Sequence, residues 1–213
     1  MSVFASLIAR DLRRAWTSGG LTLPIAFFLL AVILFPFAVG PDRDILTRIA
    51  TGAVWTAALL AALLPVERLI VPDMESGVID QLVVRGLTDP TIAAAKMVAH
   101  WLGFAPALLI ATLAAAALLG MEAAQLRTTL IALAIGTPGL AALGVITAAL
   151  VAGLRGAGAL AGLVMLPFAL PLLIFGAGAG EGAGAIKLLA ATSLLLVAGA
   201  PFVAGSAMRM ARG

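Results

Sequence analysis

The sequence predicts an all-α integral membrane protein with six transmembrane helices and an N-terminal interfacial helix. Of its 213 residues, 63% are hydrophobic and 11% are charged, whereas soluble domains contain about 25% charged residues. Six long stretches hold no Asp, Glu, Lys or Arg. A helix needs about 17–25 apolar residues to cross the hydrocarbon core of a bilayer. We therefore expect spans at about 21–40, 49–66, 101–121, 128–154, 156–180 and 188–208.

The remaining composition narrows the class of protein further. The apolar stretches lack the alternation of barrel strands, so helices must satisfy their backbone groups within the lipid. The chain has no cysteine, which excludes disulfides and thiolate metal sites. Its basic residues are scattered between apolar blocks, so we expect a lipid bilayer around the chain and no nucleic-acid partner.

Residues 1–18 are expected to form the interfacial helix that precedes the first span. Apolar side chains recur there at helical spacing, and Trp16 suits the headgroup level of the membrane. Asp11 and Arg14 nevertheless fall on the apolar arc of this helix. Either they pair with each other at the lipid surface, or they dock the helix onto another segment on the cytoplasmic side.

The distribution of basic residues predicts that both termini are cytoplasmic. Loops that face the cytoplasm carry an excess of Lys and Arg. With the N-terminus inside, nine basic residues lie on the cytoplasmic side and four on the other. The nine are Arg10, Arg13, Arg14, Arg68, Arg85, Lys96, Arg155, Arg209 and Arg212, and the four are Arg43, Arg48, Arg127 and Lys187.

The longest segment between spans, residues 67–100, is expected to be a cytoplasmic loop with a short amphipathic helix. The run 73–77 can turn, apolar residues between Val78 and Val83 then recur at helical spacing, and Arg85-Gly86 ends the helix. Thr88-Asp89-Pro90 provides a polar N-cap and an early proline for a helix that continues into the third span. Such a loop suits docking to a soluble partner, and a simple surface connector is the alternative.

Proline and glycine predict local irregularities in the later spans. Pro167 and Pro171 remove two backbone donors from successive turns, so we expect the fifth span to be bent or broken. The Gly-Ala repeat over 176–185 favours a flexible hairpin on the outer side. Gly158 and Gly162 form a GxxxG step, a weak indication of close helix packing.

Catalytic motifs are missing from this sequence. It has no Walker A loop, and its one histidine, His100, has no Cys or Tyr to join it in a site. We expect His100 to be an interfacial polar residue beside Trp101, with axial ligation of a heme as the alternative. The charge-free spans disfavour ion-coupled transport, because ionisable groups inside a membrane normally mark such pathways. We therefore expect the energy source to lie on another chain.

An ordered series of motifs along almost the whole chain resembles the heme exporter protein B family, the permease subunits of cytochrome c maturation ABC transporters. The series begins with Arg10-Asp11-Leu12-Arg13, Phe27-Phe28, Leu34-Phe35-Pro36-Phe37, Gly40-Pro41 and Trp55. It continues with Glu75-Ser76-Gly77, Asp80-Gln81-Leu82, Lys96, Ala99-His100-Trp101-Leu102 and Gly136-Thr137-Pro138. It ends with Gly153-Leu154-Arg155, Leu166-Pro167, Pro171 and Ile174-Phe175-Gly176. The chain departs from the family at the start of the loop, where it has Pro65-Val66-Glu67-Arg68-Leu69-Ile70 and Pro72.

The resemblance implies one permease domain over residues 1–213, of ABC-2 type architecture, in a bacterial inner membrane. It implies a separate ABC ATPase subunit that hydrolyses ATP, a second copy of this chain and further cytochrome c maturation subunits as partners. It also implies heme export, or release of a heme-loaded chaperone, with heme as cargo and no cofactor or metal bound directly by this chain. The loop would carry the coupling helix that rests on the ATPase, and the matching residues are Glu75, Gly77, Asp80, Gln81 and Leu82.

Three other functions stay open at the level of sequence. An ABC permease that exports a lipid or a drug has the same features. A membrane-embedded enzyme needs convergent polar groups near one membrane face, and only Asp73, Glu75 and Asp80 come near that requirement. A structural scaffold is the third alternative, and it predicts that changes at Gly77 or Gln81 leave ATP hydrolysis unaltered.

Overall fold

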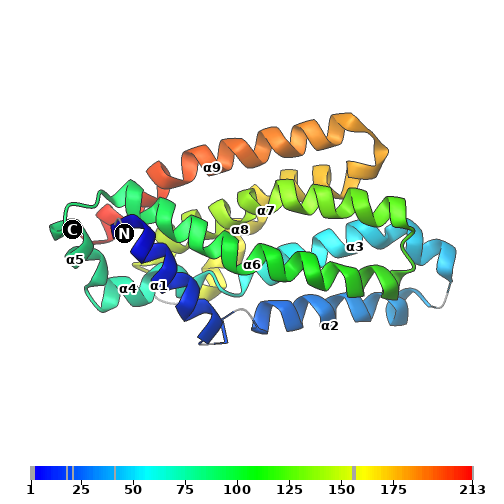
Figure 1. Cartoon of the computed structure of the whole chain (residues 1–213), viewed down its shortest axis with the longest axis horizontal. Helices are drawn as coiled ribbons and strands as arrows, with labels where there is room; N and C mark the ends of the chain where they lie inside the picture. The colour runs from blue at the N-terminus through cyan, green and yellow to red at the C-terminus, as the bar shows by residue number, and fades with distance from the viewer. Residues whose placement is uncertain (1–2, 18, 21, 41, 155–156, 213) are drawn as a thin grey trace.

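The structure, a computed structural model, describes residues 3–17, 19–20, 22–40, 42–154 and 157–212. Throughout these residues it contains helices and no strands. Long helices run side by side along the longest axis, and both termini lie at the same end of the bundle (Figure 1). We call this the terminal end. The helices are α1 (Val3–Thr17), α2 (Thr22–Val39), α3 (Arg43–Leu63), α4 (Glu67–Glu75), α5 (Val78–Val84), α6 (Asp89–Leu119), α7 (Ala123–Val151), α8 (Ala157–Ala177), the 3-10 turn η1 (Gly178–Glu181) and α9 (Ala183–Arg212).

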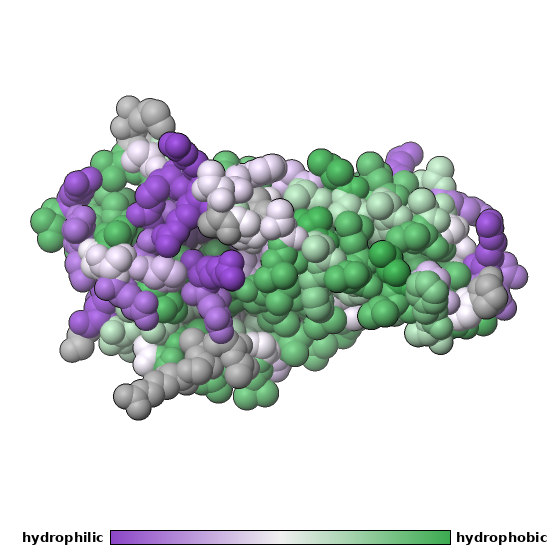
Figure 2. Space-filling view, turned by 90° about the horizontal axis from the view of Figure 1, so that it is seen from below, coloured by the Kyte–Doolittle hydropathy of each residue, from purple (hydrophilic) through white to green (hydrophobic). Residues whose placement is uncertain are grey.

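The six predicted spans are confirmed, in order, by the six helices that are long and apolar enough to cross a membrane. They are α2, α3, α6, α7, α8 and α9. Apolar side chains form a broad band around the bundle, and polar side chains gather at its two ends, most densely at the terminal end (Figure 2). This division of the surface is the one that a bilayer requires of a protein that crosses it.

Two of the membrane helices begin several residues before the charge-free stretch predicted as the span, because a polar side chain caps each of them. Helix α3 begins at Arg43 because the Asp42 carboxylate accepts hydrogen bonds from the backbone N–H groups of Asp44 and Ile45. Helix α6 begins at Asp89, where the Thr88 hydroxyl accepts from the N–H of Thr91. The predicted start of this helix, which leads into the third span, is therefore confirmed.

The predicted turn over residues 73–77 is wrong in its first half. Asp73 and Glu75 belong to α4, which continues through Pro72, and the chain turns only at Ser76 and Gly77. Gly77 has φ of 69°, in the left-handed region that glycine adopts at little cost. Asp73 stays helical because its carboxylate is bound from both neighbouring helices, as described below.

Two predictions about the later spans are corrected in part. Helix α8 is continuous through Pro167 and Pro171, so the fifth span is not broken, and a bend in it stays a prediction. The Gly-Ala stretch 176–185 joins α8 to α9 as a hairpin would, but it is mostly helical, because its two ends belong to these helices and η1 lies between them. Among the described residues, no atom lies within 4 Å of a Cβ built on Gly162, so the described part of the chain does not pack closely against this glycine. Its predicted neighbour Gly158, and Arg155 of the charge count, lie outside the residues described in full.

The core of the bundle is built around Trp55 of α3, whose side chain is fully buried. Gly136 of α7 and Gly176 of α8 lie directly against the indole ring. A Cβ at either position would come within 2.4 Å of ring carbons, so only glycine leaves room for the indole. The share of buried residues in the apolar window is 67% for α7 but only 17% for α2. The centre is therefore held by α3, α6 and α7, while α2, α8 and α9 face outward.

Candidate functional site

Helix α5 is a short amphipathic helix at the terminal end of the bundle (Figure 1). Its buried side chains are Ile79 and Leu82, which pack into the hydrophobic core. Val84 is 87% exposed, and Val83 is exposed as well. The predicted amphipathic helix is thus confirmed, except that Val83 lies on the outer face. One face of α5 is therefore packed against the bundle, and the apolar side chains at its C-terminal end, which we call its tip, are exposed.

The five residues nominated for docking lie in and around this helix, in three different settings. Glu75 and Gln81 are exposed, and Asp80 is exposed but paired. Gly77 forms the turn before α5, and Leu82 is on the buried face of α5. Four of the five therefore lie at or near the surface, whereas Leu82 anchors the helix from below.

Ion pairs tie α5 to the last turn of the chain. The guanidinium of Arg212 in α9 lies 3.2 Å from the Asp80 carboxylate and also pairs with Asp89 at the start of α6. Arg209 lies 3.4 Å from the same Asp89 carboxylate. The side chains of Arg212 and Asp89 are 16% and 10% exposed. Charges so shielded from water are screened less by salt than surface pairs. We call Asp80, Asp89, Arg209 and Arg212 the C-terminal clamp.

A second charge cluster, which sequence reasoning missed, joins three helices at the terminal end. Asp73 of α4 accepts from the ammonium group of Lys96 of α6, 2.6 Å away, and both side chains are at most 5% exposed. Asp73 also pairs with Arg10 of α1, and with Arg14 of α1 at 3.1 Å. Lys96 lies 3.2 Å from Asp11 of α1. We call Arg10, Asp11, Arg14, Asp73 and Lys96 the buried charge cluster.

The cluster decides between the two interpretations of α1. Asp11 pairs with Arg10 and Lys96, while Arg14 pairs with Asp73. These contacts confirm the alternative in which α1 docks onto another segment. Burial alone would lower the pKa of the Arg10 guanidinium, but hydrogen bonds and attraction from Asp11 and Asp73 outweigh it and raise that pKa. The only sequence signal for this cluster was the pair of charges on the apolar arc of α1, because its partners lie 59 to 85 residues away.

His100 is buried in α6, and its placement at the membrane interface stays a prediction. Its ring stacks on Phe104 with the centroids 6.0 Å apart, and its Nε2 atom makes no hydrogen bond with any described residue. Among the described residues, no group of three or more His, Asp or Glu side chains could hold a metal ion. What the described residues do bring together at the terminal end is two sets of ion pairs and the exposed side of α5.

Six helices long and apolar enough to cross a membrane, with a short amphipathic helix paired to the last helix at one end, define a polytopic membrane protein. Residues 2–211 match the family model described as "CcmB protein". The chain belongs to the CcmB family.

Curated relatives match over nearly the entire length of both chains. The chain is 39% identical to heme exporter protein B of Paracoccus denitrificans, with 96% of this chain and 98% of the relative covered. It is 36% identical to heme exporter protein B of Bradyrhizobium diazoefficiens and of Escherichia coli, with 98% of both chains covered in each comparison. The family match over residues 2–211 includes the loop between the second and third spans and all of the buried charge cluster.

Proposed function

We propose that this chain is the permease subunit of an ABC transporter complex for heme in cytochrome c biogenesis, driven by a separate ATPase subunit. The name of the matching relatives, heme exporter protein B, supports heme as the cargo. The chain itself is not a catalyst in this proposal. Its part is to change shape when the ATPase does, and either to export heme or to release a heme-loaded chaperone from a neighbouring subunit.

The observation that carries the proposal is the exposed tip of α5. The side chain of Val84 is 87% exposed, whereas the opposite face of the same helix is buried. Burying such an exposed valine against a partner is favourable, by about 25 cal/mol per Å² of apolar surface removed from water. No residue that the structure describes covers Val84, and we propose that it docks into a groove on the ATPase subunit.

The C-terminal clamp connects α5 to two of the long helices, so a movement of the docked helix can be transmitted to the membrane-spanning part. A push on α5 is transmitted through Asp80 to Arg212, and so to α9 and to the start of α6 at Asp89. Both helices continue across the bundle. Rigid movement of packed helices is an ordinary way of switching such assemblies, because packed interfaces hold discrete arrangements.

We further propose that the terminal end faces the cytoplasm, where ATP is available. Most of the described basic residues lie there, and only Arg43, Arg48, Arg127 and Lys187 lie toward the opposite end, which fits the excess of positive charge on cytoplasmic segments. A second copy of the chain is expected to pack against the outward-facing helices. Of these, α8 and α9 have only 28% of the residues in their apolar windows buried within one chain.

The experiment is copurification with the ATPase subunit in detergent. Replacing Val84 by Asp is expected to weaken recovery of the ATPase at least tenfold, because a charge would enter the proposed apolar contact. The matched control is V39D, since Val39 is an exposed valine in the last turn of α2, at the opposite end of the bundle. Equal recovery with both variants would contradict the proposal. Deletion of the gene separates the two transport alternatives, because loss of c-type cytochromes is expected for a heme permease and not for a lipid or drug exporter.

A further inference from the structure

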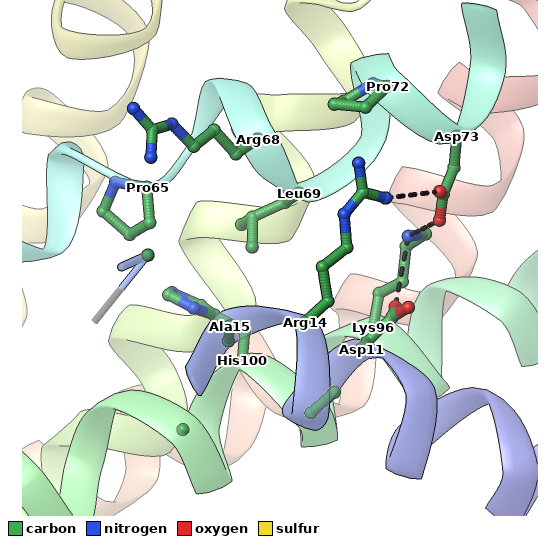
Figure 3. A pocket seen from close by; sticks show the side chains of 13 residues that line it. Asp11, Arg14, Ala15, Pro65, Arg68, Leu69, Pro72, Asp73, Lys96 and His100 are labelled. Atoms are coloured by element: carbon green, nitrogen blue, oxygen red, sulfur yellow. Dashed lines mark hydrogen bonds and ion pairs between the residues drawn. The ribbon is translucent and has the colours of Figure 1, made fainter. Parts of the chain in front are cut away.

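A cavity of about 270 Å³ lies between α1, α4 and α6 at the terminal end, beside the buried charge cluster. Figure 3 shows Arg14 of α1 and Arg68 of α4 around this space, with His100 of α6 at its other wall. The lining combines charged side chains with apolar ones. A ligand there would have one part among charges and one part against apolar side chains.

The charges in the cavity wall leave positive charge without a counterion. The lining cations are Arg14, Arg68 and Lys96, and the lining carboxylates are Asp11 and Asp73. Both carboxylates are already occupied, because each is bound by Lys96 and by an arginine of α1. The dashed contacts of Figure 3 reach Arg14 and Lys96 but not Arg68. The Arg68 side chain makes no ion pair with any residue that the structure describes.

The wall opposite the acids adds a polar group that also lacks a partner. His100 is 8% exposed, and its Nε2 atom has no hydrogen-bond partner within the described chain. A buried polar atom without a partner costs about 1–3 kcal/mol. The buried Nε2 atom of His100 is therefore a sign that a further group completes the cavity, and the exposed Arg68 is a cation that can bind it without breaking an ion pair.

The rest of the wall indicates what that group is attached to. Ala15, Pro65, Leu69 and Pro72 give the cavity an apolar side. A guanidinium binds phosphate oxygens in a bidentate manner. Basic pockets between membrane helices near a membrane surface bind anionic headgroups by this chemistry.

We propose that the cavity binds a phosphate group, with Arg68 as its principal ligand, and that the phosphate is the headgroup of an anionic phospholipid whose acyl chains lie against the apolar side. The site is independent of the proposed ATPase contact, because α5 takes no part in it. A lipid held there would touch α1, α4 and α6 together, and so would stabilise the arrangement that the buried charge cluster also holds.

The test is thermal unfolding of the full chain, purified in detergent and titrated with three probes. Short-chain phosphatidylglycerol is expected to raise the unfolding temperature with saturation, and phosphatidylcholine is not. Inorganic phosphate at the same concentrations identifies the source: stabilisation by phosphatidylglycerol alone assigns a lipid, and equal stabilisation by both probes assigns a free phosphate as the ligand of the same site.

Variants then locate the effect. R68Q is expected to weaken the apparent affinity for phosphatidylglycerol about tenfold. R68K is expected to weaken it less, because lysine keeps the positive charge but cannot bind phosphate in the bidentate manner of a guanidinium. The matched control is R85Q, which removes the same charge from an exposed arginine that does not line the cavity. Arg68 is exposed and unpaired, so its loss is not expected to impair folding. Absence of stabilisation by either phosphate probe, or equal loss in R68Q and R85Q, would overturn the proposal.

Discussion

The ammonium group of Lys96 in α6 lies 2.6 Å from the carboxylate of Asp73 in α4, with both side chains almost completely enclosed. This pair fixes the loop between the second and third spans onto the bundle. Removing one partner of a buried ion pair leaves a charge without compensation and costs about 3–5 kcal/mol. We expect K96M to lower the free energy of unfolding by about that amount, measured by denaturant titration in detergent. The control K187M, at an exposed lysine of α9, is expected to change it by less than about 0.5 kcal/mol.

A double-mutant cycle tests whether the pair itself is responsible. D73L leaves Lys96, Arg10 and Arg14 facing one another with a single carboxylate, so it is expected to be as destabilising as K96M. In the double variant D73L/K96M, both charges are removed together. Residues in direct contact show interaction energies of about 0.5–3 kcal/mol in such cycles. Additive losses in the double variant would show that the two side chains act separately.

The glycines around Trp55 predict a steric effect at single positions. A Cβ at Gly136 would lie 2.4 Å from the indole ring, and one at Gly176 would lie 2.2 Å from it. Because the indole is fully buried and cannot move aside, we expect G136A and G176A each to destabilise the fold by about 1–3 kcal/mol. Gly144 is the matched control on α7, since a Cβ there would meet His100 at an ordinary 3.4 Å. A thermal-shift series in detergent that ranked G144A with the other two would contradict this packing argument.

The turn between α4 and α5 predicts a backbone effect without a steric one. Gly77 has φ of 69°, and nothing lies within 4 Å of a Cβ built there. Alanine resists this conformation by about 1 kcal/mol, whereas asparagine tolerates it. We expect G77A to increase amide hydrogen exchange in α5, because the helix is then joined by a strained turn. G77N is expected to stay close to the original protein, and equal exchange in all three would exclude a role for the turn.

The membrane helices could be predicted from sequence because each depends on a local property. Apolar length marks the spans, and a capping residue such as Thr88 marks a helix start within three or four positions. The same local signals placed α5 between Gly77 and Arg85. Local signals failed where a tertiary contact was stronger, as at Asp73, which remains helical after Pro72 because Lys96 and Arg10 bind its carboxylate.

The parts of the site that connect distant segments could not be predicted in this way. No period in the sequence relates Asp80 of α5 to Arg212 of α9, which are 132 residues apart. The alternation of glycine and alanine over 176–185 also gave no sign that Gly176 lies against Trp55, 121 positions earlier in the chain. Such contacts depend on which helices pack together, and a single sequence shows the apolar faces without naming their partners.

The absence of cysteine makes the orientation of the chain directly testable. Glu75 ends α4 at the terminal end, and Glu181 lies in η1 between α8 and α9, so a single cysteine at either position is the only thiol in the protein. Both glutamates are exposed, which keeps the substitutions E75C and E181C compatible with the fold. If the terminal end faces the cytoplasm, a membrane-impermeant maleimide added to intact cells labels E181C, and labels E75C only after the inner membrane is opened. The reverse pattern would place the exposed tip of α5 on the side without ATP and would contradict the proposed docking to an ATPase.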